Sequence, residues 1–447
     1  MHRALPPSAD EFEVVRDPLW NTIRVDRTAV RIIDTPEFQR LRQIRQLGLA
    51  HLVYPGATHT RFDHALGVYH LARRTLRILA ERGELEQVSA DDLRLVPYAA
   101  LLHDIGHYPF SHAVEELDPE RVPEHHEQLS GRFLRAPALA DALAELGEGA
   151  VERIELLIRG ESDSPLQGLV SGSLDLDKIE YLNRDAMFCG VPYGVVDVDR
   201  LLHALTLLRD PETGRLEVGV HAKGLAALES LLFAKYQMFR NVYWHHAVRA
   251  ATALYLRLVR ESVDAGILTA EDLVGRTDEG LLTLIEMRAQ AAGERGARVA
   301  SQWLPAVRYR RLPKRALEIS GDVLRDLPFQ RWWYDDDALR RRLEDRLAGE
   351  LGLQPDEVFL DYPEKPRMMG LDLLLLEPGS EPQRLTESGR AGRIDLPRVS
   401  DELYHSARVF RVFTTERREL APGVLVSLLR LDRHSLERRL AEPEPLT

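Results

Sequence analysis

The chain has 447 residues and a formal net charge of -12, and its apolar and charged fractions, 44% and 29%, are typical of a water-soluble globular protein. This length permits two or three domains. The acidic balance argues against a general nucleic-acid-binding surface but leaves room for a local phosphate pocket. The single cysteine, Cys189, excludes an internal disulfide, and no apolar run approaches the roughly 20 residues that a membrane-spanning helix needs. The N-terminal residues hold no apolar signal-peptide core, so we expect a cytoplasmic protein without membrane contact.

The N-terminal part of the chain predicts a pair of strands followed by short helices. Residues 12–15 and 23–25 are rich in β-branched and aromatic side chains, and the Asp17-Pro18 pair lies between them. Apolar residues then recur at helical spacing over residues 28–47, with a break at Pro36. A loop is expected over residues 48–62.

The middle of the chain predicts a succession of helices. Ser89 is a good N-cap, and Asp91 and Asp92 favour the first turn of the helix that leads into His103. Gly266 is typical of the residue that follows a helix. The predicted helices cover residues 63–82, 89–104, two or three segments within 125–160, 174–187, 198–208, 223–265 and further segments to about residue 300, with a strand at 216–220.

After residue 300 the pattern changes to a mixture of strands and helices. Strands are predicted at 308–319, 357–361, 371–376, 407–413 and 424–429, and helices at 335–351 and 435–441. Residues 377–396 are rich in Pro, Gly and Ser and predict a loop. We therefore expect a mainly α protein, with a helical bundle in residues 1–300 and a smaller α+β region in residues 301–447 that serves assembly or regulation.

The densest chemistry directly follows an apolar helical run, where one short stretch holds His103, Asp104, His107 and His112. Imidazole and carboxylate groups are the usual side-chain ligands of a divalent cation. Because Gly106 ends the helix, the later histidines can leave its axis and turn toward one point. An isolated His-Asp pair is more often structural than functional, but the additional histidines favour a site.

Two flanking segments supply further ligand candidates. His64 stands at the start of the preceding predicted helix, and Asp175 and Asp177 begin a later one. Positions two apart on a helix point about 200° away from each other, so we expect only one of these aspartates to bind the ion. Lys178 and Arg184 nearby suit phosphate oxygens. The sequence has no CxxC or HExxH motif, so zinc-finger, c-type haem and zincin-protease interpretations have no support.

The order of His64, His103-Asp104 and Asp177 resembles the H…HD…D signature of the HD-domain phosphohydrolases. Neighbouring segments closely resemble the deoxynucleoside triphosphate triphosphohydrolases (dNTPases) of that superfamily, which include vertebrate and bacterial enzymes. The matching segments are Asp17-Pro18, Arg31 to Arg42, Gln46-Leu47-Gly48, Tyr54 to His59 and Arg61 to His64, and the resemblance is dense over about residues 12–260. It implies an HD-domain helical bundle that binds one divalent ion, such as Mn²⁺, Mg²⁺ or Fe²⁺. The implied metal ligands are His64, His103, Asp104 and Asp177.

The resemblance also implies how a dNTP substrate would be held. The triphosphate ligands would be Arg61, Lys178 and Tyr181. The groups around the α-phosphate, which include the catalytic residues, would be His107, His112, Glu115 and His126. The sugar would lie against Gln46, Leu47, Asp185 and Tyr243. Of these, Gln46 and Asp185 would bond the 3′-hydroxyl, and Tyr243 would crowd the space of a 2′-hydroxyl.

Five residues resemble nucleotide effector sites of the vertebrate members. Asp34, Gln39 and Arg42 match a guanine-nucleotide pocket, and Arg310 and Lys314 match a second site that binds a dNTP between subunits. The resemblance therefore implies a nucleotide effector and a homo-oligomer, either a dimer or a tetramer. A solvated basic strand is the alternative interpretation of Arg310 and Lys314.

Elementary chemistry supports a phosphohydrolase without the resemblance. A metal ion lets a water molecule lose its proton near neutral pH, and cationic side chains such as Arg61 and Lys178 can neutralise phosphoryl oxygens. A 5′-alkoxide leaving group needs a proton, which a histidine near a carboxylate such as Glu115 can supply. A deoxy sugar can be selected by excluding the extra hydroxyl through shape.

Three functions are compatible with these residues. The leading hypothesis is metal-dependent hydrolysis of dNTPs to deoxynucleoside and inorganic triphosphate, with water attacking the α-phosphate. The second is another HD phosphohydrolase activity: a phosphodiesterase, a nucleotidase or a single-strand nuclease. Lys178 and Tyr181 favour a triphosphate over a polymer. The third is a non-catalytic nucleotide sensor, against which the complete set of metal ligands argues.

Overall fold

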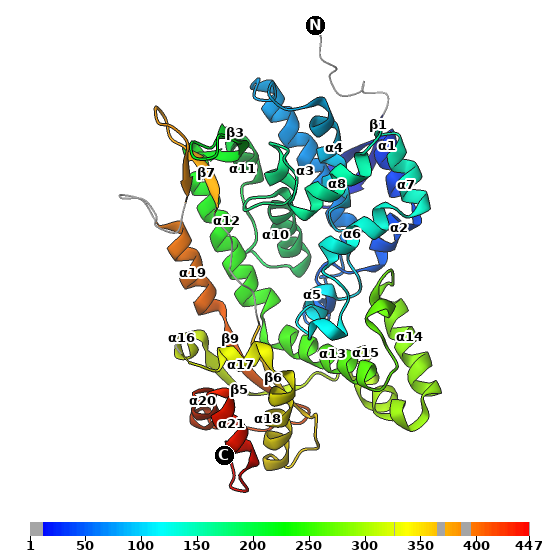
Figure 1. The fold of residues 1–447 in the computed structure, drawn as a ribbon, viewed down its shortest axis with the longest axis vertical. Helices are drawn as coiled ribbons and strands as arrows, with labels where there is room; N and C mark the ends of the chain where they lie inside the picture. The colour runs from blue at the N-terminus through cyan, green and yellow to red at the C-terminus, as the bar shows by residue number, and fades with distance from the viewer. Residues whose placement is uncertain (1–11, 326, 364–371, 386–394, 447) are drawn as a thin grey trace.

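Helices dominate the part of the chain that this computed structural model describes, which comprises residues 12–325, 327–363, 372–385 and 395–446. The prediction of a mainly α fold is therefore confirmed. In Figure 1 an upper helical body holds the N-terminal half, a lower lobe holds most of the C-terminal third, and α13 (His246–Asp264) lies between them. Among the described residues, no helix is both long enough and apolar enough to cross a membrane.

The upper body starts with an antiparallel hairpin and continues as a bundle of helices. Its strands are β1 (Phe12–Asp17) and β2 (Asn21–Asp26), and its helices are α1 (Arg27–Ile33), α2 (Pro36–Gln39), α3 (Arg61–Glu81), α4 (Ala90–Leu102), α5 (Ser111–Val114), α6 (His126–Leu134), α7 (Pro137–Ala144), α8 (Ala150–Arg159), α9 (Gln167–Val170) and α10 (Leu176–Cys189). Helix α3 packs against both α4 and α10. Their apolar faces share one buried cluster, so the ends of these three helices are fixed relative to one another.

The helix predicted at 63–82 begins two residues earlier, at Arg61. The cause is a capping box, in which the Thr60 backbone N–H and hydroxyl donate to Asp63 Oδ2 at 2.9 and 2.8 Å. Arg61 and His64 therefore lie on the first turn of α3, and both side chains are buried.

Two predicted helices in the middle of the chain were wrong in their extent. The helix expected over 198–208 ends at Ala204, and the chain continues as a strand. The segment expected as one helix over 223–265 is broken by a π-helical turn, Phe239–Tyr243, before α13 begins at His246. The elements of this part are α11 (Val198–Ala204), β3 (Leu205–Arg209), β4 (Leu216–His221), α12 (Leu225–Met238), α14 (Asp278–Ala291) and α15 (Leu304–Arg308). The spacing of apolar residues does not reveal the one extra residue that a π-helical turn adds to a helix. This turn includes Tyr243.

The C-terminal third contributes to two sheets. Strands β5 (Lys314–Ser320), β6 (Val358–Asp361) and β9 (Val409–Thr414) form an antiparallel sheet of order β5-β9-β6, while β7 (Leu373–Leu376) and β8 (Gln383–Leu385) extend the β3-β4 hairpin of the upper body. The helices are α16 (Gly321–Leu324), α17 (Gln330–Asp335), α18 (Asp337–Glu350), α19 (Leu396–Ala407), α20 (Pro422–Leu429) and α21 (Arg433–Ala441). A separate buried cluster fills the lower lobe.

Two strand predictions in this third were wrong. The segment 308–319 is a strand only from Lys314 onward, because α15 occupies residues up to Arg308. The segment 424–429 is helix α20, in which Pro422 takes the first turn and Leu425, Leu428 and Leu429 are buried at helical spacing. A short apolar run does not distinguish a buried strand from a buried helix. The loop predicted over 377–396 contains β8, and its residues 386–394 lie outside the described residues.

A candidate metal and phosphate site

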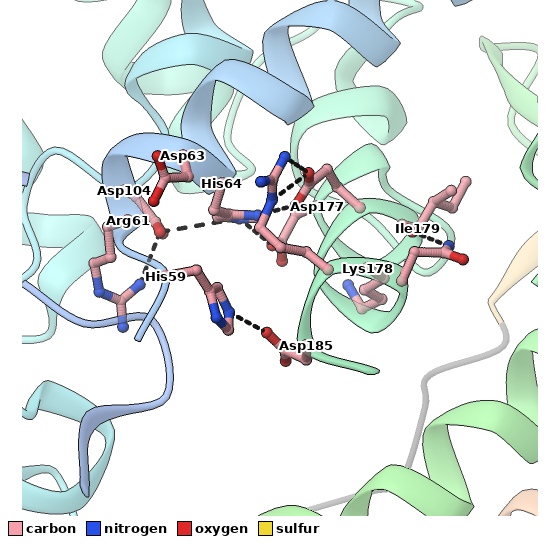
Figure 2. Close-up of polar contacts among 12 residues, drawn as sticks. His59, Arg61, Asp63, His64, Asp104, Asp177, Lys178, Ile179 and Asp185 are labelled. Carbon is pink, nitrogen blue, oxygen red and sulfur yellow. Dashed lines mark hydrogen bonds and ion pairs between the residues drawn. The ribbon is translucent and has the colours of Figure 1, made fainter. Parts of the chain in front are cut away.

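Four candidate donor residues come from the ends of the three packed helices, and Figure 2 labels three of them, His64, Asp104 and Asp177. His64 lies on the first turn of α3, His103 and Asp104 follow the last turn of α4, and Asp177 lies on the first turn of α10. His64 Nε2 is 3.0 Å from Asp177 Oδ1 and 3.1 Å from His103 Nε2. Asp104 Oδ1 is 3.3 Å from His103 Nε2, and its Oδ2 is 4.0 Å from His64 Nε2. His103 Nε2 is 3.8 Å from Asp177 Oδ1, so His64, His103 and Asp177 are close enough together to hold one divalent ion, and Asp104 stands beside them.

Both histidines are oriented by a second contact. His64 Nδ1 donates to Glu180 Oε2 at 2.6 Å, and His103 Nδ1 donates to the Ala100 carbonyl at 2.8 Å. In each ring Nε2 is therefore the nitrogen that can bind a metal ion once it has lost its proton. Glu180 is itself fully buried and accepts from Trp20 Nε1 at 2.9 Å. These contacts therefore fix the orientation of both imidazole rings.

Sequence reasoning missed Glu180, although a signal was available. It stands three residues after Asp177, on the same face of α10. Gly67 on α3 leaves the room that its carboxylate needs, because a Cβ at position 67 would lie 1.9 Å from Glu180 Oε1. Arg184, expected near phosphate, is instead buried and pairs with Glu180 and with Asp17 at 3.0 Å.

The electrostatics of the donor group favour a cation. Burial opposes protonation of His64, but its hydrogen bonds with Asp177 and Glu180 outweigh that effect and raise its pKa to about 10. Burial also opposes protonation of His103, and the charge of Asp104 raises its pKa. Burial alone would raise the pKa of Asp177, yet the two histidines hold it well below its usual range. The carboxylates of Asp104, Asp177 and Glu180 thus stabilise a positive charge at the position of the two histidines.

The structure distinguishes the two aspartates between which the sequence left a choice. Asp175 is the N-cap of α10, where its Oδ1 accepts from the Lys178 backbone N–H at 2.9 Å. Its other oxygen pairs with the Lys178 side chain. Asp177 is the aspartate that contacts His64, so the donor geometry favours Asp177 as the ligand and Asp175 as a cap.

A second group of histidines lies beside the donors. His107 Nε2 is 3.0 Å from Asp104 Oδ1, and the His107 ring stacks on that of His126 with 3.6 Å between centroids. Glu115 Oε1 accepts from His126 Nδ1 at 2.8 Å, and its Oε2 is 3.6 Å from His112 Nδ1. The four residues expected around an α-phosphate therefore form one contiguous group.

The histidines of this group differ in burial. Burial holds the pKa of His107 well below its usual range and lowers that of His126 to about 4, so both rings are neutral at pH 7. The His112 side chain is 65% exposed. The close approach of α6 depends on Gly106, where a Cβ would lie 2.0 Å from the His126 carbonyl oxygen.

The three expected triphosphate ligands line the same cavity as His103, Asp104 and Asp177. Arg61 Nη1 donates to Asp104 Oδ2 at 2.7 Å, and its buried Nε has no partner among the described residues. Lys178 Nζ donates to the Gly172 carbonyl at 2.9 Å, and the charges of Asp175 and Asp177 raise its pKa against burial. Burial holds the pKa of Tyr181 well above its usual range, so its hydroxyl remains a donor. A polyanion would meet two fixed cations here.

The four expected sugar contacts lie on another wall of the cavity, whose volume is about 940 Å³ and whose lining includes Gln46, Leu47, Asp185 and Tyr243. Asp185 Oδ2 accepts from the Tyr243 hydroxyl at 2.6 Å, and Oδ1 lies 2.8 Å from His59 Nε2. The buried Oε1 of Gln46 has no partner within the described chain. His59, to which the sequence analysis gave no role, therefore helps to orient Asp185.

The five expected effector residues lie outside this cavity. Gln39 and Arg42 contact each other, since Arg42 Nε donates to Gln39 Oε1 at 2.9 Å. Asp34 is exposed at the end of α1. Arg310 and Lys314 are also exposed, and Arg310 Nε donates to the Leu52 carbonyl at 2.5 Å. Their effector role stays a prediction.

A helical bundle that brings two histidines and nearby carboxylates together, beside a group of histidines and cationic side chains, is an arrangement that suits a metal-dependent phosphohydrolase. The comparisons with known proteins agree with this class. The family model of the HD domain matches residues 61–180, and that of the HD associated region matches residues 196–387.

Relatives extend the match over most of the chain. The uncharacterized protein MJ1154 of Methanocaldococcus jannaschii is 32% identical over 359 residues, which cover 80% of this chain and 70% of that protein. The deoxynucleoside triphosphate triphosphohydrolase SAMHD1 of Bos taurus is 34% identical over 257 residues, which cover 48% of this chain and 43% of SAMHD1. The crystal structure of a hypothetical protein from Aquifex aeolicus superposes with a TM-score of 0.66 at 26% identity and covers 94% of this chain and 99% of that one. The chain therefore belongs to the HD-domain phosphohydrolase family and is similar to dNTPases of that family, and a divalent metal ion is its cofactor.

Proposed function

We propose that the protein hydrolyses dNTPs to deoxynucleoside and inorganic triphosphate through attack of water on the α-phosphate. One observation carries this proposal: three of the four candidate metal donors (His103, Asp104 and Asp177), the histidine group and the sugar-facing residues line a single cavity of about 940 Å³. The similarity to SAMHD1, which is named a deoxynucleoside triphosphate triphosphohydrolase, supports the same substrate class.

The metal end of the cavity would activate water and neutralise charge. When bound by His64, His103, Asp104 and Asp177, a divalent ion would lower the pKa of a water ligand and stabilise negative charge on the α-phosphate. Arg61 keeps Asp104 ionised through their 2.7 Å contact, and its buried Nε makes no hydrogen bond to any described residue. Lys178 adds a second fixed positive charge for the triphosphate.

The histidine group would hold the phosphate and protonate the leaving 5′-oxygen. His107 and His126 are buried and neutral, so they suit hydrogen bonding to phosphoryl oxygens. His112 is mostly exposed and can carry a proton without a large desolvation cost, and Glu115 lies 3.6 Å away to stabilise the charged ring. We therefore assign the role of general acid to His112, with Glu115 as its orienting carboxylate.

The sugar end would select a deoxyribose. Asp185 is held by His59 and Tyr243, and the unpartnered Oε1 of Gln46 offers a second acceptor for the 3′-hydroxyl. The Tyr243 ring is fixed by its 2.6 Å bond to Asp185, so it would crowd an added 2′-hydroxyl. Leu47 supplies an apolar contact on the same wall.

We further propose that a homo-oligomer forms and that a nucleotide effector binds between subunits. Four of the five candidate effector residues, Asp34, Arg42, Arg310 and Lys314, are exposed, which leaves them available to a neighbouring subunit or a ligand. Light scattering with and without dGTP tests this idea. An Arg310→Ala/Lys314→Ala variant that still assembles on dGTP would contradict the assignment of these residues.

Product analysis tests the reaction. The purified protein is incubated with each dNTP and NTP, with Mn²⁺ or Mg²⁺, in the presence and absence of a second nucleotide. The proposal predicts deoxynucleoside and triphosphate in equal amounts from dNTPs, little turnover of NTPs, and no turnover by a His103→Ala variant. Release of pyrophosphate, of monophosphate, or of oligonucleotide fragments from single strands would instead support another HD phosphohydrolase activity.

A further inference from the structure

A buried arginine joins the lower lobe to the α5 turn (residues 111–116), which carries the proposed general acid His112. Arg249 lies on the first turns of α13 and is 5% exposed. Its Nη1 and Nη2 donate to Glu116 Oε1 and Oε2 at 2.8 and 2.7 Å. Its Nε and Nη2 donate to Asp361 Oδ1 at 3.0 and 2.6 Å. One guanidinium thus bridges two carboxylates that lie 245 positions apart in the chain.

Glu116 belongs to the segment that carries the catalytic candidates. It directly follows Glu115, which accepts from His126 and lies beside His112. The segment is short: α5 has only four residues, and it is preceded by Phe110 in a left-handed conformation with φ of 53°. So short a helix has little stability of its own, and its position depends on contacts with the rest of the fold.

Asp361 belongs to the lower lobe. It is the last residue of β6, the edge strand of the β5-β9-β6 sheet, and its side chain is 3% exposed. Arg249 can therefore hold Glu116 in place only while β6 is seated against α13. The geometry also requires arginine, because a lysine cannot donate two parallel hydrogen bonds to one carboxylate and two more to another.

We propose that Arg249, held by Asp361, is a positioning residue that fixes the α5 turn so that Glu115 and His112 face the substrate. This inference rests on the proposed function for the roles of those two residues. Because Asp361 lies on β6, the packing of the C-terminal sheet against α13 determines where Arg249 holds the α5 turn. The position of that turn then determines how His112 meets the leaving group. The metal donors lie on α3, α4 and α10, so the bridge acts on the acid without touching the metal.

The chain offers a matched control on the same helix. Arg257, two turns further along α13, donates to Asp356 Oδ1 at 2.8 Å, and Asp356 precedes β6 just as Asp361 ends it. Asp356 has a φ of 67°, a conformation that asparagine tolerates. Asp356→Asn therefore weakens one contact between α13 and the lower lobe and leaves the α5 turn untouched, while Arg257 keeps its bond to Glu344 Oε2 at 2.6 Å.

The test compares Asp361→Asn and Glu116→Gln with Asp356→Asn in the full chain. We expect kcat on the best dNTP to fall at least tenfold in the first two variants, with KM and Mn²⁺ affinity within twofold of wild type, and to change less than twofold in Asp356→Asn. Backbone hydrogen exchange over residues 111–118 should accelerate in the first two only. Glu116 is 26% exposed, so Glu116→Gln should fold even if Asp361→Asn does not.

Equal changes in kcat in the variants and the control, or unchanged exchange over residues 111–118 in both Asp361→Asn and Glu116→Gln, would overturn the inference. A parallel rise in KM and in the Mn²⁺ dissociation constant would also overturn it, because the bridge would then act on the whole site. The exchange measurement needs no substrate. If the wild-type protein hydrolyses no dNTP, the proposed function fails, while the comparison of exchange rates still decides whether Arg249 positions the turn.

Discussion

The metal donors and the acid-bearing turn lie beside each other in sequence and in space, yet the fold holds them in different ways. The donors stand at the ends of three packed helices, and buried partners such as Glu180 and Arg61 fix their orientation. His112 instead stands on a four-residue helix and is largely exposed, and Glu115 directly follows that helix. A metal site gains affinity from rigid donors, whereas an acid must exchange protons with solvent, so the two functions favour different supports.

The largest expected effect is the loss of the metal. Asp177→Ala removes a donor that lies 3.0 Å from His64, and we expect no measurable Mn²⁺ binding by calorimetry and at least a thousandfold loss of kcat. Asp175→Asn is the matched control, because that residue caps α10 and asparagine caps a helix about as well as aspartate. Equal loss of metal in the two variants would show that the donor assignment is wrong.

A change in the acid-bearing turn (residues 111–115) should lower turnover without changing metal binding. His112→Gln keeps a polar side chain of similar size but cannot donate the proton, so we expect kcat to fall about 100- to 10,000-fold with Mn²⁺ affinity unchanged. His125→Gln, at the exposed neighbour of His126, is the control and should retain most activity. Metal loss in His112→Gln would contradict the separation of the two regions.

The contact between Glu180 and His64 predicts that metal affinity falls, but is not lost, when this contact is weakened. Glu180→Gln weakens the bond that orients His64, and we expect the Mn²⁺ dissociation constant to rise about 10- to 100-fold. Gly67→Ala should act in the same direction, because its Cβ would displace the Glu180 carboxylate. Gly349→Ala, where a Cβ meets nothing within 4 Å, should leave the affinity unchanged.

Metal affinity should also depend on pH. The carboxylates around His64 raise its pKa to about 10, so in the metal-free protein His64 is protonated at neutral pH and the ion must displace that proton. Mn²⁺ binding should therefore tighten about tenfold per pH unit between pH 6 and 8 for each proton displaced. In the metal-free protein the same raised pKa contributes stability below pH 6.5, the ordinary value, and this is lost as pH rises toward 10. A pH-independent dissociation constant would contradict this account.

Much of the candidate site could be predicted because its residues occur in short local patterns. His103-Asp104 and the spacing of His64 and Asp177 indicated the HD-domain family, which the comparisons confirm. The assignments of individual site residues stay predictions. Arg249 could not be found from sequence, because its partners lie 133 and 112 positions away and an arginine on a helix face has many ordinary roles.

The errors in the fold prediction share a physical cause. The broken helix over 223–265 and the misassigned segment 424–429 both lie where apolar residues are dense, and there periodicity says little about the hydrogen-bond pattern of the backbone. The capping box at Thr60 was visible as Thr-x-x-Asp, and recognising it would have placed the start of α3 correctly.

Hydrolysis of a dNTP in ¹⁸O-labelled water, followed by mass spectrometry of both products, tests the central claim most directly. If water attacks the α-phosphorus at the metal site while the acid-bearing turn protonates the 5′-oxygen, one ¹⁸O appears in the triphosphate and none in the deoxynucleoside. Label in the deoxynucleoside 5′-hydroxyl, or label in a monophosphate released with pyrophosphate, would contradict attack of water on the α-phosphorus with the deoxynucleoside as leaving group.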